Sequence, residues 1–116
     1  MADKVAYETD GAPDLRSREA TEVTPVETLV PSAAGFLGLM HGHGIVIQPF
    51  TGLTGVTHNH AVMASLTEIH PDGQPFIGNA VMKICNVAPH DNGVVDVRVE
   101  ISWDSDLPVR VSFLVS

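Results

Sequence analysis

Basic residues are scarce in this sequence. Six lysines and arginines stand against fourteen aspartates and glutamates, which gives a formal charge of −8 and a pI near 4.9. A protein that binds nucleic acid neutralises phosphates with clustered lysine and arginine side chains. A basic amphipathic stretch of the kind that lies on an anionic membrane is missing as well. We therefore expect neither a nucleic acid nor a membrane among the partners.

Cysteine is almost absent. Cys85 is the only one, which excludes an intrachain disulfide and an all-cysteine metal site. Because it follows Val81, Met82 and Ile84 in a mostly apolar strand, we expect a buried structural thiol. The sequence also lacks a run of about 18 apolar residues that could span a membrane. Its first residues do not have the layout of a signal peptide, so we expect a cytoplasmic protein or one incorporated into a larger particle.

Aromatic residues and catalytic motifs are sparse too. Only 5% of the chain is aromatic, which disfavours a carbohydrate-binding module without excluding it. A nucleophile elbow, a phosphate-cradling loop and a dinucleotide fingerprint are all missing from the sequence. Asp104 and Asp106 are too few for a calcium site and are ordinary turn residues. These absences favour a non-catalytic protein over an enzyme.

What is present is an alternation of apolar and polar residues with a period of two. It is clearest in 94–104 and 108–115, where apolar side chains occupy every second position, as in half-buried antiparallel strands. One apolar series is Val95, Val97, Val99, Ile101 and Trp103, and the other is Val109, Val111, Phe113 and Val115. We expect Trp103 to belong to the core or to an interface.

Turn sequences divide the second half of the chain into strands. The segments 70–75, 89–93 and 104–108 are rich in proline, glycine, aspartate and asparagine. We expect strands near 45–49, 55–70, 76–88, 94–104 and 108–115. Strands at this spacing predict an all-β fold, an antiparallel β-sandwich or small barrel, over residues 32–116.

Residues 1–31 differ from this domain and are interpreted as a polar N-terminal arm. Their prolines oppose a long helix, which leaves an extended arm or a disordered tail as alternatives. Apolar side chains near the end of the arm favour tethering to the domain: Val23, Val26, Leu29 and Val30. The glycine-rich segment 32–44 is expected to be a loop that crosses closely over another part of the backbone.

Charge is absent from the middle of the chain. From Thr28 to Thr67 the sequence has no aspartate, glutamate, lysine or arginine. A domain of this size has too much surface to hide forty consecutive residues. The centres of subunit interfaces are depleted of charge. We therefore expect this stretch to face another subunit, with a monomer core as the alternative.

Four histidines lie within the uncharged stretch, as the pairs His41/His43 and His58/His60. If the segment folds as a hairpin that turns at 49–52, the four imidazoles share one face and approach each other across the two strands. Imidazole binds divalent transition metals, so these histidines are candidate metal ligands. On an apolar face, however, histidine is more often a hydrogen-bonded structural residue than a ligand, and a third alternative is a switch that weakens association at pH 5.

The sequence as a whole favours a structural or interaction protein. We expect a β-sandwich subunit of a homo-oligomer or larger assembly that uses its N-terminal arm and its uncharged middle for contacts. In outline this layout is similar to small capsid-decorating and other assembly proteins, although no family motif supports the likeness. The alternative is a small metal-dependent enzyme or ligand-binding barrel with a four-histidine site, and a carbohydrate-binding module is third.

Overall fold

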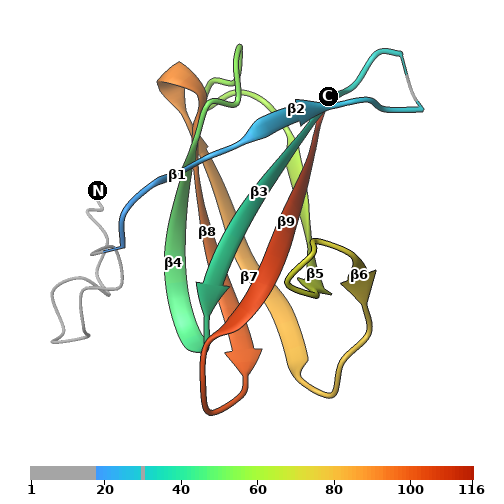
Figure 1. Cartoon of the computed structure of the whole chain (residues 1–116). Coiled ribbons are helices and arrows are strands. Elements are labelled where there is room, and N and C mark those ends of the chain that lie inside the picture. The colour runs from blue at the N-terminus through green and yellow to red at the C-terminus, as the bar shows by residue number, and fades with distance from the viewer. Residues whose placement is uncertain (1–17, 30) are drawn as a thin grey trace, which may run out of the picture.

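The described chain is built from β-strands arranged in two sheets (Figure 1). The computed structural model describes residues 18–29 and 31–116. The strands are β1 (Thr21–Glu22), β2 (Thr24–Val26), β3 (Ala34–Gly42), β4 (Gly44–Thr51), β5 (Val62–Ile69), β6 (Pro75–Phe76), β7 (Val81–His90), β8 (Val94–Ser102) and β9 (Leu107–Val115). A 3-10 turn, Asp91–Gly93, joins β7 to β8.

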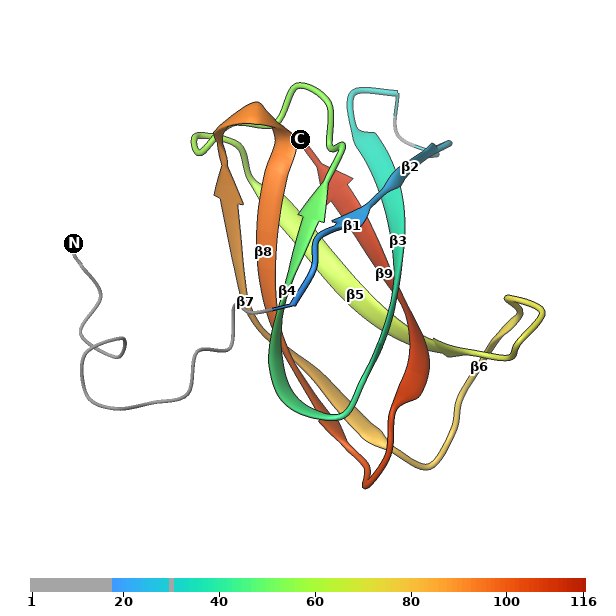
Figure 2. The same ribbon diagram turned by 60° about the vertical axis from the view of Figure 1, so that its left-hand side comes forward.

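The two sheets form a curled sandwich, which confirms the predicted all-β class. One sheet has four strands in the order β1-β4-β8-β7, and the other has five in the order β2-β3-β9-β5-β6. The strand pairs are antiparallel apart from β1 with β4. Two tight connections, from β3 to β4 and from β8 to β9, carry the chain directly from one sheet to the other (Figure 2).

The core follows from the alternation in β8 and β9. Every second residue of β8, from Val95 to Ile101, is completely buried, and the charged residues between them point outward. The inward residues of β9 meet them from the opposite sheet, where the ring of Phe113 packs edge-on against Phe50 at 5.0 Å between centroids. Trp103 does not continue this series, because it lies in the turn after β8 with 43% of its surface exposed.

The predicted loop at 32–44 is wrong, because nine of its residues form strand β3. Its glycines do not break the strand; they allow other groups to approach it closely. A β-carbon on Gly38 would lie 2.6 Å from the ring of Phe50, and one on Gly35 would lie 2.8 Å from the methyl of Thr28. In place of the expected loop that crosses another part of the backbone, the structure has a strand with side chains packed closely against its glycines.

Residues 21–26 run from one sheet to the other across their shared open side (Figure 2). Strand β1 pairs with the end of β4, and β2 then pairs with the start of β3. Val23, between them, donates its backbone N–H to Thr51 O at 2.8 Å and buries its side chain in the core. We call residues 18–26 the strap. The strap ties residues 18–26 of the predicted arm to the domain. Of the apolar residues expected to tether the arm, Val26 and Leu29 are exposed. Residues 1–17 and 30 lie outside the described chain.

The strap is held by a buried glutamine. Gln48 lies on the inner face of β4 and is only 2% exposed. Its Nε2 donates to Glu19 O at 2.9 Å and to Thr21 Oγ1 at 3.2 Å, while its Oε1 accepts from Arg18 Nε at 2.8 Å. Arg18 also donates to the carbonyl of His41. One polar side chain thus holds three residues of the strap and satisfies its own groups, as a buried amide requires.

The predicted hairpin between 45–49 and 55–70 is wrong. Strand β4 pairs with β8, and β5 pairs with β9 in the opposite sheet. The connecting residues 52–61 form an irregular loop, so β5 begins at Val62 rather than at 55. This loop packs on the turn after β7, where Leu53 N donates to Gly93 O and Gly93 N donates to Val56 O. The turn itself has the positive φ expected of an Asn-Gly pair, 66° at Asn92 and 73° at Gly93.

Replacing Gly38 with alanine tests the close packing of β3. The new methyl would collide with Phe50, so we expect Gly38→Ala to lower the free energy of unfolding by about 1–3 kcal/mol. Gly42→Ala is the matched control on the same strand, since its nearest contact would be the flexible end of Met40 at 3.3 Å. Urea denaturation measures both; equal losses in the two variants would contradict this packing.

Candidate functional site

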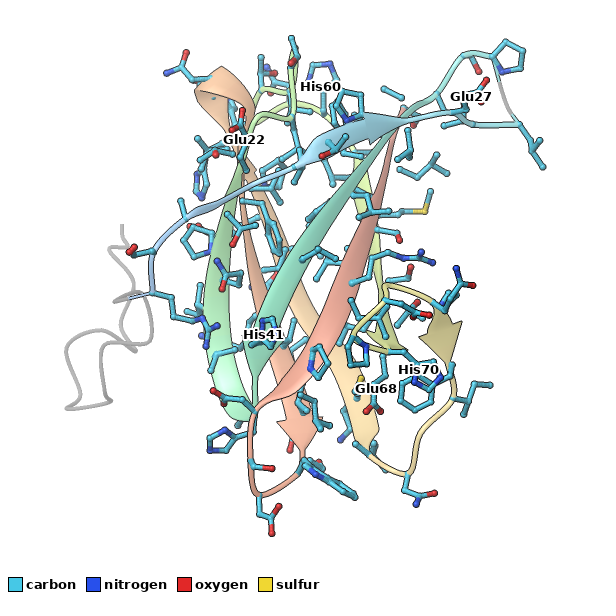
Figure 3. All side chains as sticks on the ribbon, in the orientation of Figure 1. Glu22, Glu27, His41, His60, Glu68 and His70 are labelled. Atoms are coloured by element: carbon cyan, nitrogen blue, oxygen red, sulfur yellow. The ribbon has the colours of Figure 1, made fainter. Side chains whose placement is uncertain are left out.

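The four candidate histidines do not converge. His41 lies near the end of β3 and His43 lies in the turn to β4, whereas His58 and His60 lie in the loop that follows β4. The eight residues of β4 separate the two pairs by roughly 25 Å. His41 and His60 accordingly appear at different heights of the sandwich (Figure 3). The hairpin on which the metal hypothesis depended is absent.

Two of these histidines instead form pairs with aspartates, one at each end of the sandwich. His43 Nδ1 lies 2.6 Å from Asp106 Oδ1 and joins the turn after β3 to the turn after β8. At the other end, His58 Nδ1 lies 2.7 Å from Asp91 Oδ1, which also accepts the backbone N–H of His58 at 3.1 Å. His60 accepts the backbone N–H of Thr57 at 2.9 Å. His43 and His58 therefore each connect two separate loops, whereas His60 bonds within its own loop.

A metal centre is not assembled within residues 18–29 and 31–116. Nowhere in these residues do three or more histidine, cysteine, aspartate or glutamate side chains gather in a way that could hold an ion. The further pair, His90 Nε2 with Asp96 Oδ2 at 3.1 Å, spans neighbouring strands on the outer surface of the four-stranded sheet. Each histidine pair supplies one imidazole and one carboxylate, which is fewer ligands than a structural zinc site uses.

Cys85 is exposed, so the predicted burial of its thiol is wrong. The register between β7 and β8 shifts between Ile84 and Asn86, and Cys85 is the extra residue of this bulge. A bulge breaks the alternation of the strand and turns side chains away from their expected face. The apolar neighbours of Cys85 in sequence therefore gave no guide to its burial.

The outer faces of the two sheets differ sharply in charge. On the four-stranded sheet, the outward residues of β7 and β8 include Lys83, Asp96, Arg98 and Glu100, and Lys83 Nζ lies 3.7 Å from Glu100 Oε1. On the five-stranded sheet, Arg110 is the one charged residue among those of β3, β5 and β9 that face outward. The outward set is Gly35, Leu37, Leu39, His41, Met63, Ser65, Thr67, Ile69, Pro108, Arg110, Ser112 and Leu114. We call this surface the uncharged face.

The charge-free stretch explains this asymmetry. It supplies β3, β4 and most of β5, and two of these three strands belong to the five-stranded sheet. Leu39 is 51% exposed and Met63 is exposed too, so the stretch is not simply a covered core. The signal in the sequence was the missing charge; which face would display it depends on the sheet order.

A groove of about 500 Å³ crosses the end of the uncharged face at which Gly35, Met63 and Leu114 lie side by side. Its lining is mostly apolar and comes from β2 and the segment after it, from β3, and from β5 and β9. The main apolar groups are Val26, Leu29, Met63, Phe113 and Leu114. A second hollow, of about 310 Å³, lies between β5 and the segment 76–82 and holds the carboxylate of Glu68.

Two further findings bear on function. Within the described residues, no helix has the length and apolar character needed to cross a membrane. Comparison of the chain with protein-family models, with curated proteins and with solved structures yields no match. Function is therefore argued from the geometry above.

The link between His58 and Asp91 predicts a specific pH dependence. The backbone N–H and then the imidazole of His58 hold the pKa of the Asp91 carboxyl below its ordinary value. A carboxyl with a lowered pKa stabilises the fold above about pH 4, and this contribution is lost as the pH falls through the lowered value. We expect Asp91→Asn to lower the urea midpoint at pH 7 and to have little effect at pH 3. Asp104→Asn, in another exposed turn, is the control; an equal effect of Asp91→Asn at both pH values would contradict the link.

Proposed function

We propose that this protein is a non-catalytic structural subunit that assembles with copies of itself through the uncharged face. The observation that carries the proposal is the division of charge between the two outer surfaces. A face of three neighbouring strands with a single charged residue and exposed Leu39 and Met63 is unusual for a chain of net charge −8. Depletion of charge with apolar groups at the centre is typical of subunit contacts.

The size of the face limits the contact that its three strands can form alone. Three strands about 4.8 Å apart and up to nine residues long cover a projected area of about 14 Å by 30 Å. Two such faces in contact would bury roughly 860 Å² in total, so the segment after β2 and its groove must contribute to reach the value of about 1,000 Å² that separates specific interfaces from incidental ones. Side chains that interdigitate would add to this area. A second sheet could pack on the first at about 10 Å, as sheets do inside a sandwich.

The electrostatics of the whole chain favour this surface over the others. Two copies of a protein with a formal charge of −8 repel each other at long range. Contact through the four-stranded sheet would also bring several charged groups out of water, among them Asp96 and Glu100. Contact through the uncharged face removes few charges from water, so less electrostatic work opposes it.

The proposed role of the N-terminal arm is narrower than the sequence suggested. Residues 21–26 pair with strands of their own chain. Residues 1–17, outside the described chain, and the exposed residues Glu27 and Leu29 after the strap remain candidates for contacting a neighbour. The acid switch expected from four histidines also narrows, because His41 is the one histidine of the four on the uncharged face. Its protonation would place one new positive charge per copy in the contact.

The alternative, a ligand-binding or metal-dependent protein, is separated from assembly by one measurement. Native mass spectrometry of the purified chain, combined with elemental analysis, reports subunit number and bound metal together. We expect an oligomer without stoichiometric metal. A monomer that carries one zinc or other transition metal per chain would overturn the proposal and restore the metal hypothesis.

A pair of matched substitutions tests the choice of face. Leu39 and Ile45 are 51% and 52% exposed, and they lie on the outer surfaces of opposite sheets. We expect Leu39→Lys to raise the dissociation constant of the oligomer at least about tenfold, because a lysine would be placed in an apolar contact. Ile45→Lys should leave it unchanged. Sedimentation velocity measures both, and the reverse ranking would assign the contact to the other sheet.

A further inference from the structure

The uncharged face carries one positive charge at its centre and one negative charge at its rim, and neither has a partner within the described chain. We propose that a second copy of this chain covers the face in a two-fold arrangement, with Glu27 of each copy paired with Arg110 of the other. Leu29 of each copy then enters the groove of its partner. This inference rests on the proposed function and specifies the geometry of the contact.

Arg110 lies in the middle strand of the face. In register it stands between Leu39 of β3 and Thr67 of β5, which are both uncharged. Its Nε is buried and has no hydrogen-bond partner among residues 18–29 and 31–116. Nε is covered by the chain itself, so a carboxylate from outside can reach only the terminal nitrogens of this guanidinium. There it would form a charge-assisted pair with a cation that has no counter-charge in the described chain.

Glu27 is a carboxylate in a suitable position. It follows β2 directly, is exposed, and lines the apolar groove. In the described part of the chain its carboxylate forms no ion pair. Val26 pairs with Gly35, four residues along β3 from Leu39, and β2 is separated from β9 by one strand. The backbones at Glu27 and Arg110 are therefore about 16 Å apart or more, too far for a pair within one chain.

A two-fold contact between copies can form the Glu27–Arg110 pair that one chain cannot form by itself. In a two-fold contact, if Glu27 meets the partner's Arg110, then Arg110 meets the partner's Glu27 by the same operation. The face is thus neutral on balance, and each copy offers both members of the pair. A strongly acidic chain gains by this arrangement, because the only charges brought into the contact are of opposite sign.

Leu29 and the groove form a second self-complementary pair. Leu29 is fully exposed at the edge of the groove, where a leucine gains nothing from its own fold. The groove is about 500 Å³ and mostly apolar, and its lining includes Leu29 itself and Met63 at the start of β5. A projecting apolar side chain beside an apolar hollow on one surface is the arrangement that a two-fold contact can use twice. Together with the opposite charges of Glu27 and Arg110, it favours a second copy over an unrelated partner as the occupant.

Charge reversal tests the pairing directly. We expect Glu27→Arg and Arg110→Glu each to raise the dimer dissociation constant at least about tenfold in sedimentation velocity, because each places like charges together. The double variant should return to within about threefold of the wild type. An equal mixture of the two single variants should form a heterodimer of two-chain mass, since both of its contacts are then complementary. Lys83→Glu, an equal charge change on the other sheet, is the matched control and should have no effect.

The outcomes separate this geometry from the proposed function. If the wild type is a monomer, both fail. Two other outcomes would show that the pairing is wrong while the face remains the contact. In the first, the wild type associates but the double variant stays dissociated. In the second, the single reversals have no effect while Leu39→Lys dissociates the oligomer.

The variant Leu29→Asp tests the fit of Leu29 in the groove. It should keep the thermal unfolding midpoint of the wild type, since Leu29 is fully exposed, and it should weaken association at least about tenfold. Unchanged association in that variant would overturn the fit of Leu29 in the groove.

Discussion

The strap is the constraint on which the rest of the sandwich depends. Strands β3 and β4 leave each other after a tight turn and join different sheets, so the inner faces of both sheets would be open along this side. The strap closes the gap by pairing with both sheets and placing Val23 between them, and Gln48 fixes its position from inside. The close packing of Gly38 under Phe50 and Val23 belongs to the same closure. A short polar segment near the N-terminus thereby determines whether two sheets behave as one core.

The sequence predicted those parts of the fold whose pattern is local. Strands β8 and β9 were predicted correctly because one face of each is buried, which makes apolar and polar residues alternate. The turn at 89–93 was predicted because its backbone needs positive φ, which Asn and Gly adopt. Strand β3 was missed because a segment rich in glycine resembles a loop. These glycines leave room for the side chains of Phe50 and Thr28, a requirement that appears only when distant segments are packed together. The hairpin failed for a related reason. A turn-like sequence after β4 does not reveal whether the chain returns along its own sheet or crosses to the opposite one.

The candidate site shows the same limit. The missing charge between 28 and 67 was a sound observation, but its effect depends on strand order. Because β3 and β5 flank β9, the stretch contributes to one surface, while β4 takes the remainder into the other sheet. The histidines were grouped by assuming a pairing that the fold does not contain. Their actual partners, Asp91 and Asp106, lie 33 and 63 residues away in sequence, which no local spacing could suggest.

The free edges of the two sheets have a consequence for how copies of this chain can add to one another. An exposed, regular edge strand invites another strand to extend the sheet, which leads to open-ended stacking. Here β7 is interrupted by the bulge at Cys85 and carries Lys83 and Pro89, and the five-stranded sheet ends in β2 and β6, with three and two residues. Each of these features shortens or interrupts the row of backbone hydrogen bonds that an added strand would form. A strand that added to β7, β2 or β6 would therefore find few positions to pair with, whereas the face-to-face contact proposed above would close after two chains instead of continuing as a fibre.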